Sequence, residues 1–289
     1  MELRVLRYFL TVAREENITR AARLLHITQP TLSRQLIQLE EELGVILFHR
    51  GKYHISLTED GLLLKRRAQE LIALSDKTVQ ELSHQGEVIS GEIAIGCGEM
   101  KSMAFLADCI VSFQAKHPLV QFEVYSAVAD DIQEKLEHGL LDIGFLVDPV
   151  EVRKYEFLRL PFQERWGVLA RKDSKLAGKE AVTPKDLAEI PLLLGRRELV
   201  KNELASWFGE VYEQLSVPIT YNLITNAAAL VRSGAGAAIC VEHAGVTYTD
   251  LQFIPLSPVL ETGIVLVWKK NQLLPEAVGR FIQYVKNAF

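Results

Sequence analysis

The sequence contains little cysteine and no long apolar run. Its three cysteines, Cys97, Cys109 and Cys240, are odd in number and far apart, so they predict neither a disulfide framework nor a metal cluster. No apolar run approaches the ~18 residues of a membrane span. Met1–Arg4 opens an amphipathic segment with charges throughout, unlike a signal peptide. These absences argue against a membrane or exported protein and indicate a chain of the reducing cytoplasm.

The motifs of common enzyme classes are also missing. We find no phosphate-binding loop, no His-Glu-x-x-His zinc motif and no Gly-x-Ser-x-Gly nucleophile elbow. The seven histidines are scattered along the chain. The sequence therefore predicts a protein that is not an enzyme and that uses no cofactor.

Length and charge point to more than one domain. The 289 residues suit two or three units, and a hydrophobic content of 48% with 24% charged residues is typical of folded chains. Residues 1–67 hold 11 Lys and Arg against 8 Asp and Glu, a charge of +3, which leaves 21 of the 32 basic and 29 of the 37 acidic residues, or −8, for the rest. A basic head on an acidic body has the sign expected of a nucleic-acid-binding protein, although random variation explains a difference of this size equally well.

The first 57 residues predict a helix-turn-helix followed by a small hairpin. Apolar residues recur with helical spacing over Leu3–Arg14, and a shorter helix follows over Arg20–Leu25. Thr28 is a good N-cap for a third helix with inward leucines, which ends at Gly44. Residues 45–57 read as two short strands joined by a turn.

The third helix presents polar residues outward near its start. These are Gln29, Thr31, Ser33, Arg34 and Gln38. Gln can bond adenine and Arg can bond guanine in the major groove, whereas Ser and Thr can bond phosphates. The pattern alone would also suit an ordinary solvated surface.

A long helix is expected from Thr58 to about Gln85, with a length of ~42 Å. Along it, apolar and small residues recur in steps of four and three, the period of a coiled-coil seam. The positions are Leu64, Ala68, Leu71, Ser75, Thr78 and Leu82. This seam predicts dimerisation, and packing of the helix on its own body is the alternative.

After a polar hinge at 86–91 the pattern changes to alternating strands and helices. Strands are expected at 93–95, 120–125, 142–147, 167–170, 191–194, 238–241 and 265–268, and helices at 103–117, 132–138, 199–215, 227–233 and 275–288. A βαβαβ order predicts a parallel sheet with helices on its faces.

The N-terminal motifs strongly resemble those of the LysR-type transcriptional regulators. The matching residues are Phe9, Thr19-Arg20-Ala21-Ala22, Leu24, Thr28-Gln29-Pro30, Leu32-Ser33-Arg34-Gln35, Leu39-Glu40, Leu43-Gly44, Leu47-Phe48, Arg50 and Leu57-Thr58-Glu59-Asp60-Gly61. The resemblance implies an α/β chain overall: a winged helix-turn-helix over 1–58, a linker and dimerisation helix over 59–88, and a two-lobed, periplasmic-binding-protein-like effector domain over 89–289. Lobe one would hold about 91–162 plus 265–289, and lobe two about 163–264.

The resemblance also implies a function. Such proteins are sequence-specific DNA-binding transcription regulators whose promoter binding responds to a small-molecule effector. They are dimers or tetramers that bind inverted repeats in double-stranded DNA, and RNA polymerase is an expected partner. The DNA-binding residues carried over are Thr28, Gln29, Pro30, Thr31, Ser33, Arg34, Gln38, Arg50 and Lys52.

The wing departs from the family, where it is often rich in arginine. Here the segment reads Arg50-Gly51-Lys52-Tyr53-His54-Ile55-Ser56. Fewer cations predict fewer phosphate contacts and a shallower salt dependence. Arg50 fits either a DNA contact or a structural role in closing the hairpin.

The effector is expected in a cleft between the lobes, outside the carboxyl ends of strands and against helix N-termini. The candidate residues are Cys97, Gly98, Glu99, Met100, Lys101, Ser102, Phe145, Arg196, Arg197, Thr225 and Asn226. Backbone N–H groups at 96–102, with Lys101 and Ser102, would hold an anion. However, Gly98, Glu99 and Met100 stand where the family often has Ser or Thr for carboxylate effectors, which disfavours an ordinary carboxylate. Glu99 would suit a cationic ligand or face solvent.

Two alternatives stay open. Cys97, near a helix start and a lysine, would make a thiol-based redox regulator if its pKa were lowered, whereas a small buried residue is the simpler interpretation. A solute-binding protein of a transport system would suit the cleft module alone, but not the attached helix-turn-helix.

Overall fold

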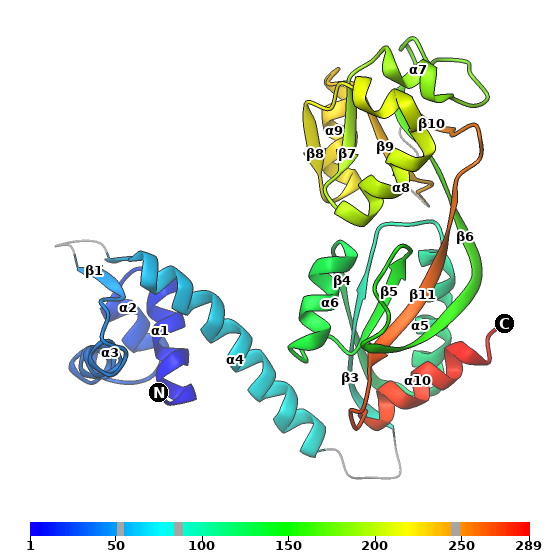
Figure 1. Ribbon diagram of the computed structural model, residues 1–289. Coiled ribbons are helices and arrows are strands. Elements are labelled where there is room, and N and C mark those ends of the chain that lie inside the picture. The colour runs from blue at the N-terminus through cyan, green and yellow to red at the C-terminus, as the bar shows by residue number, and fades with distance from the viewer. Residues whose placement is uncertain (51–54, 84–88, 244–248) are drawn as a thin grey trace. The chain divides into compact units, whose positions relative to one another are not determined.

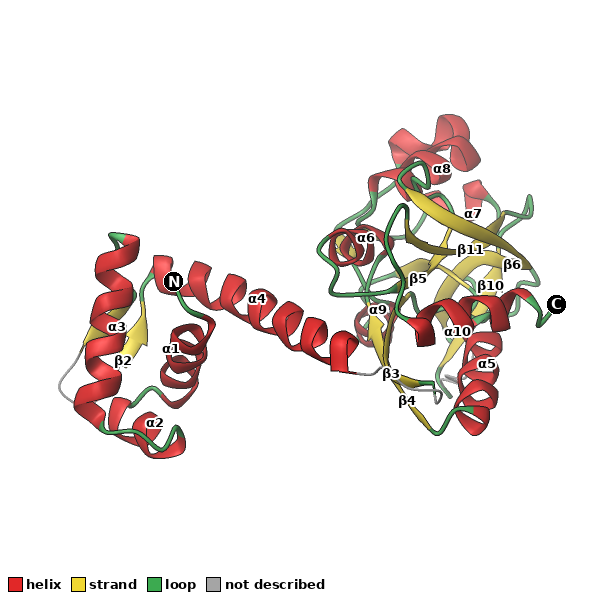
Figure 2. Ribbon diagram, turned by 90° about the horizontal axis from the view of Figure 1, so that it is seen from below, coloured by secondary structure: helices red, strands yellow, loops and turns green. Residues whose placement is uncertain are grey.

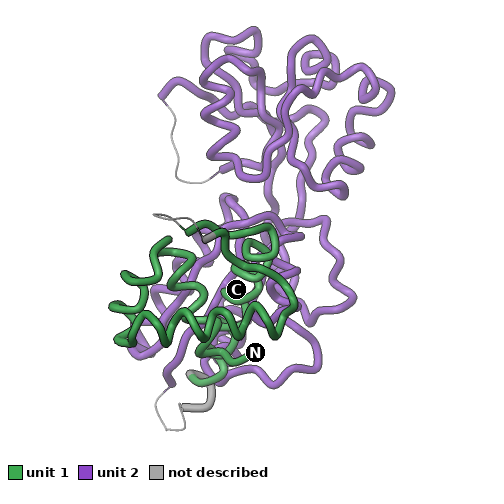
Figure 3. Tube along the Cα trace, turned by 90° about the vertical axis from the view of Figure 1, so that its left-hand side faces the viewer, with its two compact units in different colours: residues 1–85 green, residues 86–289 purple. Residues whose placement is uncertain are grey.

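The computed structural model describes residues 1–50, 55–83, 89–243 and 249–289. The chain separates into two compact units, Met1–Gln85 and Gly86–Phe289 (Figure 3). Lys52, from the predicted wing contacts, and residues 86–88 of the predicted hinge at 86–91 lie outside the described residues.

The first unit contains the predicted helix-turn-helix and hairpin (Figure 1). Its elements are α1 (Leu3–Glu15), α2 (Ile18–Leu24), α3 (Gln29–Leu43), β1 (Phe48–Arg50), β2 (Ile55–Leu57) and α4 (Glu59–Ser83). The helix starts follow the capping residues, since the Asn17 side chain accepts from the Arg20 amide at 2.9 Å and Thr28 Oγ accepts from the Thr31 amide at 3.4 Å. Gly44 ends α3 in the left-handed region, with φ of 70°.

The hairpin strands are shorter than predicted. Phe48 pairs with Leu57 and Arg50 with Ile55, but residues 45–47 form no strand. The Glu40 carboxylate explains the late start, because it accepts from the amides of Leu47 at 2.9 Å and Phe48 at 3.3 Å.

Part of the predicted seam of α4 packs on the first unit itself, as the alternative interpretation expects. Ala68 is fully buried in the core of the first unit, and Leu64 packs against the same core. The apolar residues that α4 leaves exposed include Leu63, Leu71 and Leu74, with exposed fractions of 52%, 41% and 41%. These three leucines share one face of the helix, since they are spaced by eight and three residues. Part of the predicted seam therefore stabilises the unit itself, and a neighbouring stripe remains open.

The second unit is built on a mixed sheet. Its strands are β3 (Ser90–Cys97), β4 (Leu119–Ser126), β5 (Ile143–Val147), β6 (Tyr155–Arg171), β7 (Leu192–Gly195), β8 (Ile219–Tyr221), β9 (Ala237–Val241), β10 (Leu251–Pro255) and β11 (Glu261–Lys269). Their order is β4-β3-β5-β11-β6-β9-β7-β8, with β10 also on β6. β3, β4 and β5 are parallel, as are β7, β8 and β9, whereas β6 and β11 run antiparallel to their neighbours. The parallel sheet predicted from the βαβαβ order is confirmed for β3, β4 and β5, whereas the antiparallel pairing of β6 and β11 was not predicted.

Two lobes result, because β6 and β11 pass through both halves of this unit (Figure 1). The helices are α5 (Met103–Lys116), α6 (Ala129–Glu137), α7 (Pro184–Ala188), α8 (Glu198–Phe208), α9 (Ile224–Arg232) and α10 (Glu276–Lys286), with a 3₁₀ turn over Gly209–Gln214. In lobe one, α5 and α10 lie together on one face of the sheet, and α6 covers the other (Figure 2). In lobe two, α8 packs on one face and α9 on the other.

The sequence missed the first half of β6 and two short strands. Only residues 167–170 of β6 were expected, and β8 and β10 were not. The missed part of β6 contains Pro161, and its residue types do not follow its burial, since Phe157 is exposed and Glu164 is buried. β8 has three residues, too few for a clear period. The predicted helix over 199–215 ends at Phe208 and continues as the 3₁₀ turn.

Candidate functional site

One exposed face of α3 gathers the predicted DNA-reading residues. Gln29, Pro30, Ser33, Arg34 and Gln38 line a shallow groove on this face. They lie together because positions four residues apart share a helix face, and the opposite face is fixed in the core by Leu32, Leu36 and Leu39. The same groove includes Ile37 and Glu41, which the sequence reasoning did not select.

Thr28 and Thr31 stabilise the start of α3. Their hydroxyls are 2.8 Å apart, and Thr28 caps the helix. Both remain exposed, so they can still meet a phosphate. The side chain of Arg50, like Lys52, lies outside the described part of the chain.

In the second unit a cavity of about 140 Å³ lies between the lobes. That is roughly ten times the space one water requires. Its wall is formed by 98–100, 127–129, 146–148, 195–197, 221–224 and 239–241, with Trp166 and Val200. Each of these segments lies at the carboxyl end of a parallel strand, namely β3, β4, β5, β7, β8 and β9. This is where open α/β sheets bind ligands.

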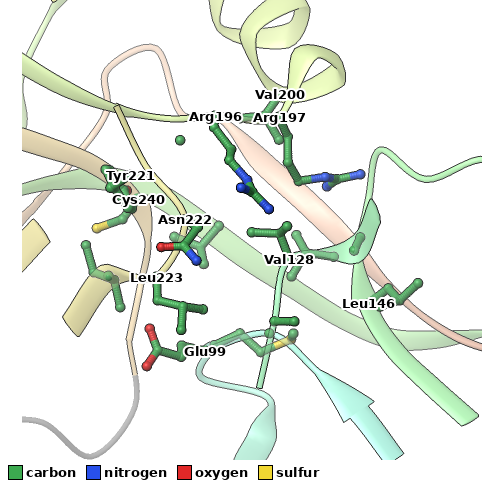
Figure 4. A pocket seen from close by; sticks show the side chains of 18 of the residues that line it. Glu99, Val128, Leu146, Arg196, Arg197, Val200, Tyr221, Asn222, Leu223 and Cys240 are labelled. Carbon is green, nitrogen blue, oxygen red and sulfur yellow. The ribbon is translucent and has the colours of Figure 1, made fainter. Parts of the chain in front are cut away.

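Five of the predicted effector residues lie on this wall, and Figure 4 shows three of them. Arg196 and Arg197 extend from the turn between β7 and α8, and Glu99 lies on the opposite side. Gly98 and Met100 complete the set.

The other six predicted residues do not line the cavity. Cys97 and Phe145 are core residues of lobe one, with exposed fractions of 2% and 0%. Both side chains lie on the face of the sheet that packs against α5 and α10, Cys97 as the last residue of β3 and Phe145 within β5. Lys101, Ser102, Thr225 and Asn226 lie at the starts of α5 and α9, just behind the wall.

The sequence reasoning missed much of the wall. Val128 and Leu146 could have been found, because β4 and β5 were predicted and the wall follows their ends. Tyr221 ends β8 and Asn222 follows it, but β8 was not predicted, and Trp166 lies within the missed part of β6.

Charged pairs join the two lobes at the rim of the cavity. Arg196 in lobe two contacts both oxygens of Asp131 in lobe one, at 2.9 and 2.7 Å. The neighbouring Arg197 donates to Asp130 at 3.0 Å and to the Pro149 carbonyl at 2.9 Å. Arg197 is 8% exposed, so these partners offset the cost of burying its charge.

Two further contacts cross the cleft. Glu99 accepts from the Thr225 hydroxyl at 2.8 Å and from its amide at 3.4 Å. Lys101 donates to Glu242 at 3.1 Å. Both bonds connect the turn between β3 and α5 in lobe one with lobe two, so opening of the lobes must break them.

The expected anion site at the start of α5 already holds a carboxylate of the chain. Glu164 accepts from the amide of Ser102 at 2.7 Å and from that of Lys101 at 3.3 Å. Glu164 lies on β6 and is 2% exposed. The prediction that these amides await an external anion is therefore corrected.

The cysteines lie in surroundings that suppress thiolate formation. Burial raises the pKa of Cys97, and a hydrogen bond with Ser126 opposes this only in part. Burial raises the pKa of Cys240 to about 12. All three cysteines are free and buried, which disfavours the redox alternative.

Comparison with known proteins identifies the family. A profile of the LysR substrate binding domain matches residues 86–289, and one of the bacterial regulatory helix-turn-helix proteins of the lysR family matches residues 3–62. The chain is a LysR-type transcriptional regulator.

Relatives of this regulator match along its length. The HTH-type transcriptional regulator YybE of Bacillus subtilis (strain 168) is 29% identical over 291 residues, covering 100% of this chain and 99% of its own. The Hca operon transcriptional activator HcaR of Escherichia coli (strain K12) is 28% identical over 299 residues, covering 99% and 97%. The crystal structure of full-length CbnR complexed with its target DNA covers 100% of both chains with a TM-score of 0.76 at 23% identity, which supports the fold.

The regulator thus combines a DNA-binding helix-turn-helix with an effector-binding domain, and its family consists of transcription regulators rather than enzymes. No helix among the described residues is both long and apolar enough to cross a membrane.

Proposed function

We propose that the exposed face of α3 reads operator DNA in the major groove. The supporting observation is that Gln29, Ser33, Arg34 and Gln38 share one exposed groove while the leucines of the same helix are buried. Arg34 is exposed and its guanidinium is suited to a bidentate contact with guanine. Thr28 and Thr31 contact DNA phosphates, and Arg50 and Lys52 of the wing add further contacts to the DNA backbone.

The test is Arg34→Ala, with Arg280→Ala as the matched control on an exposed face of α10. Loss of one bidentate base contact should weaken specific binding by roughly 1–3 kcal/mol and relax the preference at one base position. Binding selection from a random DNA pool, followed by titration of the selected site, measures both. An Arg34→Ala protein with unchanged affinity and preference would exclude this residue from base reading.

The exposed stripe on α4 supports a dimer. Leu63, Leu71 and Leu74 form an apolar surface on an exposed long helix, and such a surface gains stability when a second copy covers it. A two-fold dimer places two reading helices on the DNA, which calls for an inverted-repeat operator. Pairing of dimers into a tetramer and contact with RNA polymerase extend this proposal. Because the operator is chromosomal, the regulator works in the cytoplasm.

The interlobe cavity is the place where an effector controls DNA binding. A ligand there contacts both lobes, so its affinity depends on how far they are closed, and it shifts the balance between closed and open forms. The cross-lobe pairs of Arg196 and Arg197 stabilise the closed form without a ligand. Footprints on the selected operator with and without a cavity ligand test the coupling, and identical footprints would contradict it.

A further inference from the structure

Two of the helix starts that adjoin the cavity, those of α5 and α9, are closed by carboxylates of the chain itself. Glu164 occupies the first free amides of α5, at Lys101 and Ser102, and Glu99 occupies the amide and hydroxyl of Thr225 in α9. Free N–H groups at a helix start are the common holding point for an anionic ligand. In this regulator the amides of Lys101, Ser102 and Thr225 are already bonded. The starts of α6 and α8 also line the cavity, and their first turns carry the acidic residues Asp130, Asp131 and Glu198.

The cations around the cavity are likewise committed. Arg196 pairs with Asp131, Arg197 with Asp130, and Lys101 with Glu242. An anionic ligand would compete with these carboxylates for the same cations.

Negative charge is in excess at this place. Among the residues that the structure describes, neither Glu99 nor Glu164 has an ion-pair partner, and Glu99 stands on the cavity wall itself. A further carboxylate brought beside them would meet like charge.

The rest of the wall is mainly apolar. Met100, Val128, Leu146 and Ile239 come from both lobes and meet around the cavity. Trp166 adds a large ring, and its indole N–H has no acceptor among the described residues. Such a wall favours a ligand that gives up little hydration on entry.

We propose that the cavity takes a small, uncharged, mainly apolar molecule, and that Glu164 is a built-in replacement for a ligand carboxylate at the start of α5. The inference rests on the proposed role of the cavity as the effector site. It names the chemical class of the effector and a structural reason why anions are rejected.

The chain offers a direct reporter, because it has three methionines and Met100 is the one on the wall. The full-length protein, labelled with ¹³C at the methionine methyl groups, is titrated with three probes of one shape: isobutyramide, isobutyrate and isobutylammonium. Isobutyramide should shift the Met100 signal in a saturable way, with a dissociation constant at least ~10-fold lower than that of either ion. Met1 and Met103 serve as internal controls. Tighter binding of either ion, or no saturable shift with any probe, overturns the inference.

The role of Glu164 is tested by rescue. In Glu164→Ala the two amides lose their acceptor, so formate should raise the thermal midpoint of this variant in a saturable way and leave the wild type unchanged. If formate acts equally on both, Glu164 does not stand in for a ligand carboxylate.

Glu164→Gln covers the case in which the alanine variant does not fold. Gln keeps the shape and one acceptor oxygen but removes the negative charge. The preference for isobutyramide over isobutyrate at Met100 should then narrow, and an unchanged preference contradicts the role of the Glu164 charge.

Operator binding separates this inference from the proposed function. An uncharged ligand that shifts Met100 but leaves the footprint unchanged contradicts the proposed control of DNA binding and leaves the ligand class standing. An anion that shifts both Met100 and the footprint contradicts the ligand class alone.

Discussion

Gly61 joins the wing to the linker helix, and replacing it with alanine should destabilise the first unit. Glycine to alanine inside a helix ordinarily stabilises by about 0.5–1 kcal/mol. At Gly61 an added Cβ would lie 2.2 Å from the Leu47 carbonyl oxygen and 3.0 Å from Leu57 Cδ2. The carbonyl is backbone, so relief requires α4 to move away from the segment that leads into β1.

The same place holds the cap of α4, which limits how far the helix can move. Thr58 Oγ donates to the Ile46 carbonyl at 2.6 Å and accepts from the Gly61 amide at 3.0 Å. Overpacking of this kind costs roughly 1–3 kcal/mol, so the gain from helix propensity is outweighed. A net loss of about 1–2 kcal/mol should lower the melting midpoint of this unit by roughly 5–15 °C.

Gly279→Ala is the matched control. Gly279 lies in helix α10, and a Cβ there would meet nothing within 4 Å, so the substitution should stabilise the second unit by about 0.5–1 kcal/mol. The two units can be followed separately, because all three tryptophans, Trp166, Trp207 and Trp268, belong to the second. Far-UV circular dichroism follows both units, and tryptophan fluorescence follows the second alone. A Gly61→Ala protein as stable as the wild type would refute the argument from the Leu47 contact.

Three further predictions concern side chains of the second unit. Asp130→Asn removes the partner of the nearly buried Arg197 and should lower the free energy of unfolding by roughly 1–2 kcal/mol. Asp131→Asn breaks a more exposed pair and should lower it by less than about 1 kcal/mol. Equal losses in urea unfolding would contradict the role of burial. Burial raises the pKa of Glu203 above its ordinary 4.5, and the nearby Asp148 adds to this effect. The folded state therefore holds the proton more tightly than the unfolded state, and the protein loses stability as the pH rises above about 4.5. Glu203→Gln should therefore be more stable than the wild type at neutral pH, with the difference vanishing below about 4.5, and a pH-independent difference would count against it. Because burial raises the pKa of Cys97, iodoacetamide should modify it far more slowly than a free thiol, and rapid labelling would reopen the redox alternative.

Local patterns were sufficient for the first unit. Periodicity places the inward leucines of α3, and Thr28 and Gly44 mark its ends with capping chemistry that acts within a few residues. Since those forces are local, the outward face with Arg34 could be predicted from spacing alone. The linker shows where this ends, because Leu64 and Leu71 fit one seam in the sequence yet only the first packs on the unit's own core.

The cleft shows the same division more sharply. The sequence by itself determined an α/β unit with a ligand site at the turn 98–100, since strand ends in a parallel sheet are ligand sites whatever their residues. Its two lobes were implied by the family resemblance. Nothing in the sequence linked Ser102 to Glu164, or Arg197 to Asp130, since these partners are 62 and 67 residues apart. Only the tertiary structure brought those carboxylates to the helix starts and arginines of the cavity rim. Charge in a ligand site is set by the sum of groups that folding brings together, and this sum decides which ligands enter.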